Sequence, residues 1–309
     1  DNTISAMGSR LLKRWVALPL KDEKPINKRL EVVEYLMQNN EFASLIKEQI
    51  SQIGDLERTI SKVATARISP RECMQLKIAL QVLVPIKDAC QNSSEKTIKN
   101  IGKQIDVCRE IKEKLEKELH PNPPALLSKG NVINIGVNSE LDELREIATS
   151  GKEILQQILE RESQATGIPS LKISFNNVFG YYLEVRNTHK DKVPEDWIRK
   201  QTLVSAERYI TEELKEYESK ILVAEEKISF LEQKLYQDLV LSLSKFIAPI
   251  QLNAQLIAKL DCLYCFAFIS KKYNYKKPII DNGKSLIIKK GRHPVIERQL
   301  KAGESYVPN

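Results

Sequence analysis

The sequence predicts a mainly α protein: a helical bundle core with a long antiparallel two-helix lever arm that carries a small β-containing head, followed by the first strands of a truncated α/β domain. Two observations lead to this fold class. Apolar residues recur with heptad spacing over two long runs, at about 140–165 and 207–241, as in helices that pack along a seam. The residues between these runs alternate apolar and polar side chains instead, which indicates strands.

The N-terminal third of the chain is predicted to form the helices of the bundle. An amphipathic helix ends at Pro19, a second follows Pro25, and a third covers about 42–66. The stretch Ser69–Glu72 reads SPRE, which is a capping box with proline at the first helical position. Another helix therefore begins there.

The two runs of the arm are predicted to pack against each other along their apolar seams. In the second run, the seam holds Leu214, Ile221, Ile228 and Leu235 at one heptad position and Tyr217, Ala224 and Leu231 at the other. In the first run, the seam holds Leu141, Leu144, Ala148, Leu155 and Ile158. Asn138 or Ser139 caps the start of this run, Gly151 weakens its seam, and Glu162 ends it near the tip.

The head is predicted to contain a β-hairpin at the end of the arm. Residues 171–175 and 181–185 alternate apolar and polar side chains, and Asn176 with Asn177 is a turn signal between them. Residues 206–209 are expected to lead back into helix. Because a helix rises about 1.5 Å per residue, an arm of this length holds the head roughly 35–40 Å from the body.

The head also presents basic side chains, hydroxyls and amides, which are the groups that bind phosphate oxygens. Its charge is only mildly basic, because acidic residues are interspersed, so an ordinary solvated surface is an equal alternative on composition alone. The whole chain is similarly mixed, with 48 Lys and Arg against 41 Asp and Glu and a net charge of +7. This balance favours an acidic partner such as nucleic acid without identifying it.

The C-terminal part continues as helix to about residue 271, with a kink expected at Pro249. The composition then changes, and Asn282-Gly283 between two apolar runs at 278–288 predicts a two-residue hairpin. A separate α/β or β unit is expected to begin here. Because the sequence starts without Met and its last residues, 306–309, form no closing element, we expect a piece of a longer protein.

Several kinds of site are excluded by residue spacing. Five scattered cysteines argue against a disulfide framework and for a reducing compartment, and Cys262 with Cys265 lies in an apolar run that predicts core packing. Gly283-Lys284-Ser285 lacks the upstream glycine and the following helix of a phosphate-binding loop. Three isolated histidines form no metal or nucleophile pattern. Without a signal peptide or a run of eighteen apolar residues, the chain is expected to be cytoplasmic and to have no membrane partner.

A series of motifs resembles the MutS family of DNA mismatch-recognition proteins. In chain order they are MGSRLL at 7–12, GDLER at 54–58, SPR at 69–71, LDELR at 141–145, FN at 175–176, GYY at 180–182, QTL at 201–203, AERY at 206–209, ELK at 213–215 and GRHPV at 291–295. They follow the family's order over essentially all 309 residues. This resemblance implies core and lever helices at 1–164 and 207–272, a clamp at 165–206, and the start of an ATPase domain at 273–309.

The resemblance also implies a function for the head, which corresponds to the clamp. Clamps of this family contact the phosphate backbone of double-stranded DNA without reading bases. The matching DNA-binding residues here are expected to be Arg186, Asn187, Lys190, Arg199, Lys200, Thr202 and Ser205. No catalytic residue, cofactor or metal is expected in 1–309. ATP and Mg²⁺ are expected in the full-length parent, a DNA-dependent ATPase, together with a homodimeric state and a MutL-type partner protein.

Two other functions stay open at this point. A purely structural coiled coil whose head recognises a protein has the same seam, and only the cations of the head separate it from a DNA-binding clamp. An independent enzyme has little support, because none of the spacings supplies a catalytic group. The sequence does not determine the oligomeric state or the preferred mismatch.

Overall fold

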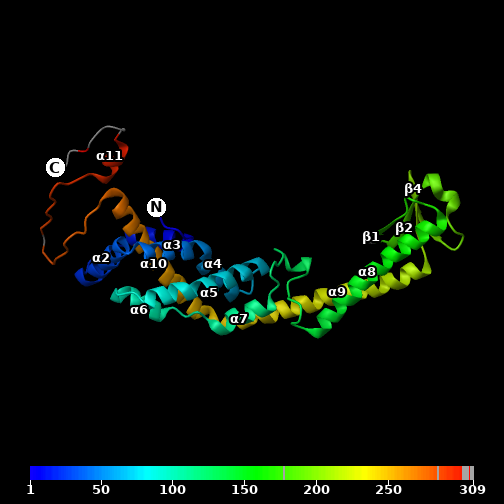
Figure 1. The fold of residues 1–309 in the computed structure, drawn as a ribbon, viewed down its shortest axis with the longest axis horizontal. Coiled ribbons are helices and arrows are strands. Elements are labelled where there is room, and N and C mark those ends of the chain that lie inside the picture. Colours follow the sequence, from blue (N-terminus) through cyan, green and yellow to red (C-terminus); the bar gives the residue numbers. More distant parts are fainter. Residues whose placement is uncertain (177, 284, 301–305, 307–309) are drawn as a thin grey trace.

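The computed structural model describes residues 1–176, 178–283, 285–300 and 306. Figure 1 shows a helical body at one end, a two-helix arm that extends from it, and a small sheet at the far end. The predicted mainly α class is therefore confirmed.

Seven helices of the body precede the arm. They are α1 (Ala6–Ala17), α2 (Glu23–Gln38), α3 (Asn40–Ile53), α4 (Leu56–Ala64), α5 (Pro70–Gln91), α6 (Lys96–Gln104) and α7 (Arg109–Glu118). The capping box at the start of α5 is confirmed, since Ser69 and Glu72 cap each other's backbone. The prediction of one helix over 42–66 was wrong. Gly54 has a φ of +71°, which breaks that run, and Asp55 then caps α4 by accepting from the Arg58 N–H at 3.2 Å.

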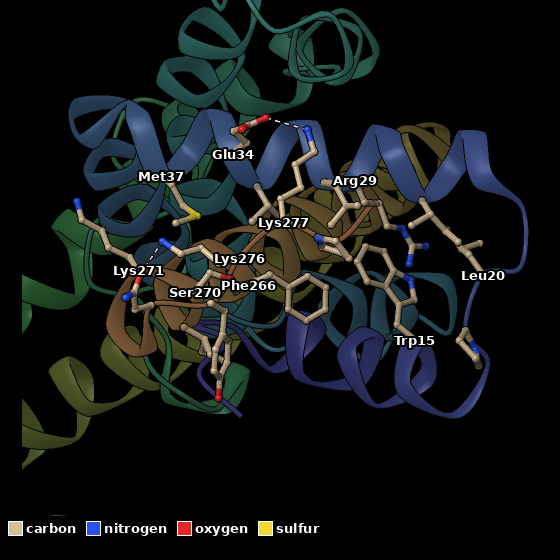
Figure 2. A pocket seen from close by; sticks show the side chains of 18 of the residues that line it. Trp15, Leu20, Arg29, Glu34, Met37, Phe266, Ser270, Lys271, Lys276 and Lys277 are labelled. Atoms are coloured by element: carbon tan, nitrogen blue, oxygen red, sulfur yellow. Dashed lines mark hydrogen bonds and ion pairs between the residues drawn. The ribbon is translucent and has the colours of Figure 1, made fainter. Parts of the chain in front are cut away.

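Aromatic side chains line a groove between α1, α2 and the C-terminal helix α10 (Ile247–Tyr273). Trp15 lies beside Phe266 with 6.2 Å between the ring centroids, and the Arg29 guanidinium lies 3.5 Å from the centroid of the Trp15 ring (Figure 2). Lys277 crosses the groove to pair with Glu34 at 2.8 Å. These contacts join the N-terminal helices to the segment that follows α10.

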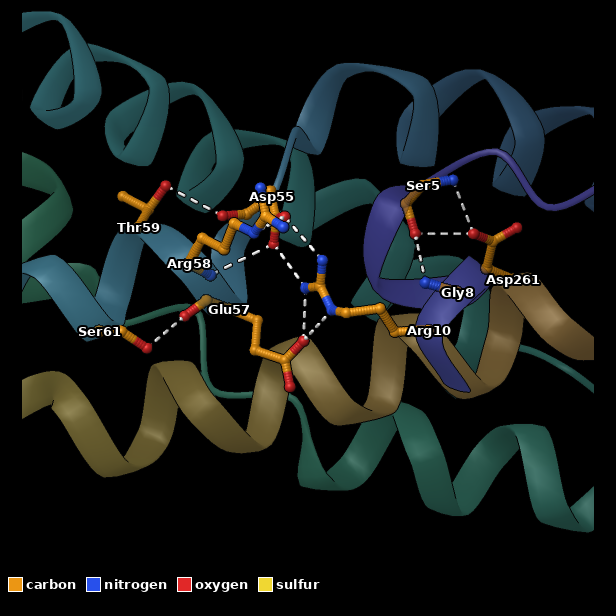
Figure 3. A network of polar contacts seen from close by, with 9 residues as sticks. All are labelled: Ser5, Gly8, Arg10, Asp55, Glu57, Arg58, Thr59, Ser61 and Asp261. Atoms are coloured by element: carbon orange, nitrogen blue, oxygen red, sulfur yellow. Dashed lines mark hydrogen bonds and ion pairs between the residues drawn. The ribbon is translucent and has the colours of Figure 1, made fainter. Parts of the chain in front are cut away.

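Figure 3 shows the polar contacts that fix α1 to the rest of the body. The fully buried Asp261 of α10 accepts from the Ile4 and Ser5 N–H groups, each at 2.8 Å, and from the Ser5 hydroxyl at 2.7 Å. Gly8 packs so closely on Asp261 that an added Cβ would collide with the carboxylate. Arg10 binds Asp55 through both terminal nitrogens and lowers the pKa of that carboxyl. The motifs at 7–12 and 54–58 are thus parts of one interface.

The arm consists of α8 (Ser139–Thr166) and α9 (Glu212–Ser242). Asn138 caps α8 by accepting from the Leu141 N–H at 2.8 Å. The predicted seam is confirmed, because its residues are buried or pack against the buried clusters. The last buried residue of the seam in α8 is Ile158, before Glu162, and the helix itself continues to Thr166 and stops at Gly167, with a φ of +63°.

Gly151 allows the two helices of the arm to approach closely instead of weakening their seam. It is buried, and a Cβ at this position would lie 2.6 Å from Cγ1 of Ile221 on α9. The low helix propensity of glycine is therefore offset by closer packing of α8 on α9.

A buried ion pair joins the base of the arm to the body. Arg145 of α8 pairs with Glu232 of α9, which is 1% exposed, and donates to the Ile133 carbonyl at 2.8 Å. Ile133 in turn forms a β-bridge with Leu119, just after α7. Helices from both halves of the chain and the loop after α7 thus meet at this contact.

The chain bends between α9 and α10 at a 3₁₀ turn, η3 (Leu243–Phe246) (Figure 1). The kink was predicted at Pro249 and lies just before it, because proline gives no N–H to the carbonyl four residues earlier and its ring crowds that carbonyl. All five cysteines are free and buried, which confirms core packing for Cys262 and Cys265.

By length and composition one helical run, Glu212–Tyr273, could cross a membrane, but 61% of its apolar 18-residue window is buried inside the protein. Buried core helices of soluble proteins can have the same length and apolar composition, so this run is only weak support for a membrane contact.

The prediction of a hairpin at 278–288 was wrong for the described residues of this segment, because they form no strand. Lys284 lies outside them. Instead, Asp281 accepts from the Gly283 N–H at 2.8 Å, and residues 286–288 are exposed. A hairpin on its own is marginally stable in water, and no described strand lies beside this segment. A short helix, α11 (Pro294–Gln299), follows. Residues 307–309, which were expected to form no closing element, lie outside the described residues.

The head contains a four-stranded antiparallel sheet in the order β1-β2-β4-β3. The strands are β1 (Lys172–Asn176), β2 (Gly180–Arg186), β3 (Ile198–Thr202) and β4 (Ala206–Ile210), and a 3₁₀ segment, η2 (Asn187–Lys192), follows β2. The predicted hairpin is confirmed as β1 and β2, although Asn177 lies outside the described residues. The expected helix at 206–209 was wrong, because these residues form a central strand that pairs with both β2 and β3.

Candidate nucleic-acid interface

One face of the head's sheet packs on the end of the arm. Leu183, Val185 and Tyr209 share a buried cluster with residues of both arm helices. Leu155, Ile158, Leu214 and Ile221 are the buried arm residues of this cluster. Trp197 extends it, with its ring centroid 6.0 Å from that of Tyr209. The arm therefore supplies part of the head's core, and the polar residues of the head are held on a fixed support.

The β3–β4 turn brings three of the predicted site residues together. The Asn187 N–H donates to the Ser205 carbonyl at 3.1 Å, and its side-chain amide donates to the Val204 carbonyl at 3.0 Å. Arg186 pairs in register with Ala206, next to the same turn. Arg186 and Asn187 thus lie beside Ser205 at one end of the two central strands, although Ser205 is far from them in sequence.

A β-bulge at Lys200 separates the remaining strand residues. Arg199 is opposite Tyr209 and Gln201 is opposite Arg208, so Lys200 has no partner across the ladder. The bulge reverses the alternation of side chains: Arg199 contacts Glu207 on one face, and Gln201 contacts Arg208 on the other. Lys200 is therefore the extra residue of the bulge, with no residue of β4 opposite it.

The carboxylate of Glu207 on β4 lies among hydrogen-bond donors and cations of the head. The Tyr209 hydroxyl donates to it, Arg199 pairs with it at 3.3 Å, and Lys190 acts on it electrostatically. These groups, above all the Tyr209 hydroxyl, lower the pKa of Glu207, while burial raises the pKa of Tyr209 to about 12. Arg199, Lys190 and Thr202, which is opposite Glu207 in register, therefore surround one carboxylate.

Arg208, which sequence reasoning did not select, organises the other face of the sheet. It pairs with Glu184 at 3.3 Å, donates to the Gln201 side chain at 2.8 Å, and lies 4.4 Å from the centroid of the Tyr182 ring. This role depends on contacts with Glu184 and Gln201 across the folded sheet, so no local signal could have found it.

All seven predicted site residues are exposed. Three of them, Arg186, Lys190 and Lys200, have no acidic partner within ion-pair distance among the described residues of the head. The tip also exposes Val204 completely, between Thr202 and Ser205. Sequence reasoning treated this stretch as a polar run and did not consider the valine. That the seven residues bind DNA stays a prediction.

No group of three or more His, Cys, Asp or Glu that could hold a metal ion occurs among the described residues. The head thus offers exposed cations, hydroxyls and amides on a rigid sheet. Such a surface can bind a polyanion.

Comparison with known proteins identifies what this architecture is similar to. The family model for MutS domain III matches residues 1–267. Three relatives named DNA mismatch repair protein MutS are similar over all 309 residues: those of Phocaeicola vulgatus at 60% identity, Bacteroides fragilis at 59% and Porphyromonas gingivalis at 52%. The chain spans only 35–36% of the length of these relatives.

Proposed function

Because the chain belongs to the MutS family of DNA mismatch repair proteins, we propose that its head binds the phosphate backbone of double-stranded DNA and that its arm couples this contact to the helical body. The backbone contact is independent of sequence, since cations that meet phosphates position a protein on the duplex without reading the bases. The mismatch itself is recognised outside these residues.

The observation that carries the proposal is the set of exposed, unpaired cations at the end of the arm. The glutamates of the sheet, Glu184 and Glu207, are already engaged by Arg208 and Arg199. Arg186, Lys190 and Lys200 make no ion pair among the described residues, although Lys190 acts on Glu207 electrostatically, and Arg186 lies next to the β3–β4 turn that exposes Ser205. Their charge is therefore available to a polyanion.

The arm provides a stiff connection between this surface and the body. Helix α8 has 28 residues, which at about 1.5 Å per residue spans roughly 40 Å. Its seam with α9 is apolar over most of its length, and the Arg145–Glu232 pair fixes its base. A change in the position of the head would therefore reach the body as a movement of the arm as a whole.

For the whole protein we propose a DNA-dependent ATPase that acts as a homodimer with a MutL-type partner. The described residues do not fit ATP or Mg²⁺, because 278–283 lacks the glycine pattern of a phosphate-binding loop and no metal-ligating group of three occurs. The nucleotide would be bound by other parts of the parent, and no step of its chemistry is assigned to this chain.

The test is the salt dependence of binding to a fluorescent duplex, measured by anisotropy with matched and mismatched DNA. Each phosphate that a cation neutralises contributes about 0.9 to the logarithmic salt slope, so three free cations predict a slope of about −2.7. The Arg186→Glu/Lys190→Glu/Lys200→Glu variant should bind at least roughly 100-fold more weakly at low salt, because each lost pair is worth about 1 kcal/mol in water and each new carboxylate also repels the phosphates. Arg199 is left unchanged, since a carboxylate there would face Glu207 and disturb the sheet.

The matched control reverses three exposed lysines of the body, Lys47, Lys99 and Lys103, which changes the net charge equally. This control should keep most of the affinity of the wild type. Equal loss in both variants would mean that only net charge matters, and unchanged binding by the head variant would favour a protein-recognition role for the head.

A further inference from the structure

A cationic pocket lies in the body, at the opposite end of the molecule from the head (Figure 1). It is a cavity of about 280 Å³ between α1, α2, α6 and α10. Lys28 and Arg29 of α2 and Lys259 of α10 line it, together with Trp15 and Thr97. It adjoins the groove of Figure 2 and shares Trp15 and Arg29 with it.

The three cations of this pocket have no acidic partner. Among the described residues, none of them makes an ion pair or donates a hydrogen bond to a protein group, whereas the half-buried Arg10, Arg145 and Lys215 are each paired with a carboxylate. Glu95 acts on Lys259 electrostatically, but its carboxylate caps α6 by accepting from the Ile98 N–H at 2.6 Å. The pocket therefore concentrates positive charge that the protein itself does not neutralise.

This arrangement is unfavourable without a ligand. Arg29 and Lys259 are both partly buried, and Lys28 adds a third like charge beside them. Burial lowers the pKa of Lys259, and the charges of Arg29 and Lys28 lower it further. Burial also lowers the pKa of Arg29. An anion in the pocket would reduce this mutual repulsion and accept charge-assisted hydrogen bonds from the ammonium and guanidinium groups.

We propose that this pocket binds an oxyanion, either a phosphate or the carboxylate of an acidic side chain. The Trp15 ring holds the Arg29 guanidinium by a cation–π contact, so its N–H groups are oriented before a ligand arrives (Figure 2). The Thr97 hydroxyl adds a neutral donor.

The test uses the fluorescence of Trp15. The chain has two tryptophans, so Trp197→Phe leaves Trp15 as the only reporter. Potassium phosphate and potassium acetate are titrated separately at constant ionic strength, with chloride as the balancing anion. The fluorescence should change saturably with at least one of them. The thermal midpoint of the wild type should rise over the same concentrations, which provides a measurement that does not depend on the Trp197 variant.

Lys259→Met is the decisive variant, because a ligand site and a structural lysine predict opposite results. If Lys259 serves a ligand, the variant should lose the saturable response and gain stability in the absence of the anion, since a buried like charge has been removed. Lys47→Met on the exposed face of α3 is the matched control and should behave as the wild type.

Each outcome decides the proposal. Saturation at lower phosphate than acetate would assign a phosphate-bearing ligand, and the reverse would assign an acidic side chain. The proposal is wrong if neither anion saturates the signal, or if Lys259→Met keeps the response. Failure of DNA binding by the head would leave this result unaffected, because the two sites share no residue.

Discussion

The body and the head of this protein differ in where polar groups form their contacts, in the buried core or at the surface. In the body, Asp261 and Asn253 are fully buried, and each is satisfied by the backbone of a distant segment. In the head, the ion pairs of Arg199 and Arg208 lie on the sheet surface, partly open to solvent. Polar groups in the body thus fix how the helices pack, whereas those in the head shape a surface.

The two regions also differ in how they obtain a core. The core of the body is built from all of its helices, from α1 to α10. The core of the head depends on the arm, because Leu155 and Ile158 of α8 and Leu214 and Ile221 of α9 complete it. The head and the distal arm therefore form one folding unit, and a contact made by the head acts directly on the arm.

The largest expected effect comes from breaking the ion pair at the base of the arm that connects the two regions. Arg145→Met would leave the carboxylate of Glu232 buried without its partner, which costs about 3–5 kcal/mol. Urea denaturation should show this loss in the free energy of unfolding. The double variant Arg145→Met/Glu232→Met should recover most of it, since no charge then remains buried. A single variant as stable as the wild type would show that the pair does not hold the base of the arm.

A smaller effect is expected when a buried leucine is replaced by alanine in each of the two cores. Leu183→Ala in the head and Leu83→Ala in the body each remove a fully buried leucine side chain and should cost about 2–5 kcal/mol. Hydrogen exchange should distinguish them: Leu183→Ala should accelerate exchange in the strands and the distal arm, and Leu83→Ala in the body. If Leu183→Ala accelerated exchange equally in α5, the head would not be a separate unit.

The smallest effect should come from the close contact within the arm. Gly151→Ala places a Cβ against Ile221 and should cost about 1–3 kcal/mol from overpacking, offset by up to about 1 kcal/mol of helix propensity. In the background of Ile221→Ala, which removes both Cγ1 and Cδ1 from the contact, the penalty should shrink. A penalty of the same size in both backgrounds would place the strain elsewhere in the arm.

The sequence by itself determined the elements that depend on neighbouring residues. The capping box of Ser69 and Glu72, the Asn138 cap and the hairpin of β1 and β2 arise from contacts over a few positions. The heptad seam is equally local, because a repeat of seven keeps apolar residues on one side of a helix wherever the partner lies. The exposed polar tip followed from the same local alternation.

Only the tertiary structure decided the rest, because it depends on pairing between distant segments. Residues 206–210 become a strand because β2 and β3 lie on either side of them, and no local pattern distinguishes this from the start of a helix. The bulge at Lys200 is a matter of register between strands. The availability of a cation depends on which glutamate the fold places beside it: Arg208 meets Glu184, 24 positions away, while Arg186 and Lys200 meet none among the described residues. Charge can be counted in a sequence, but its neutralisation is set by distances that only the folded chain defines.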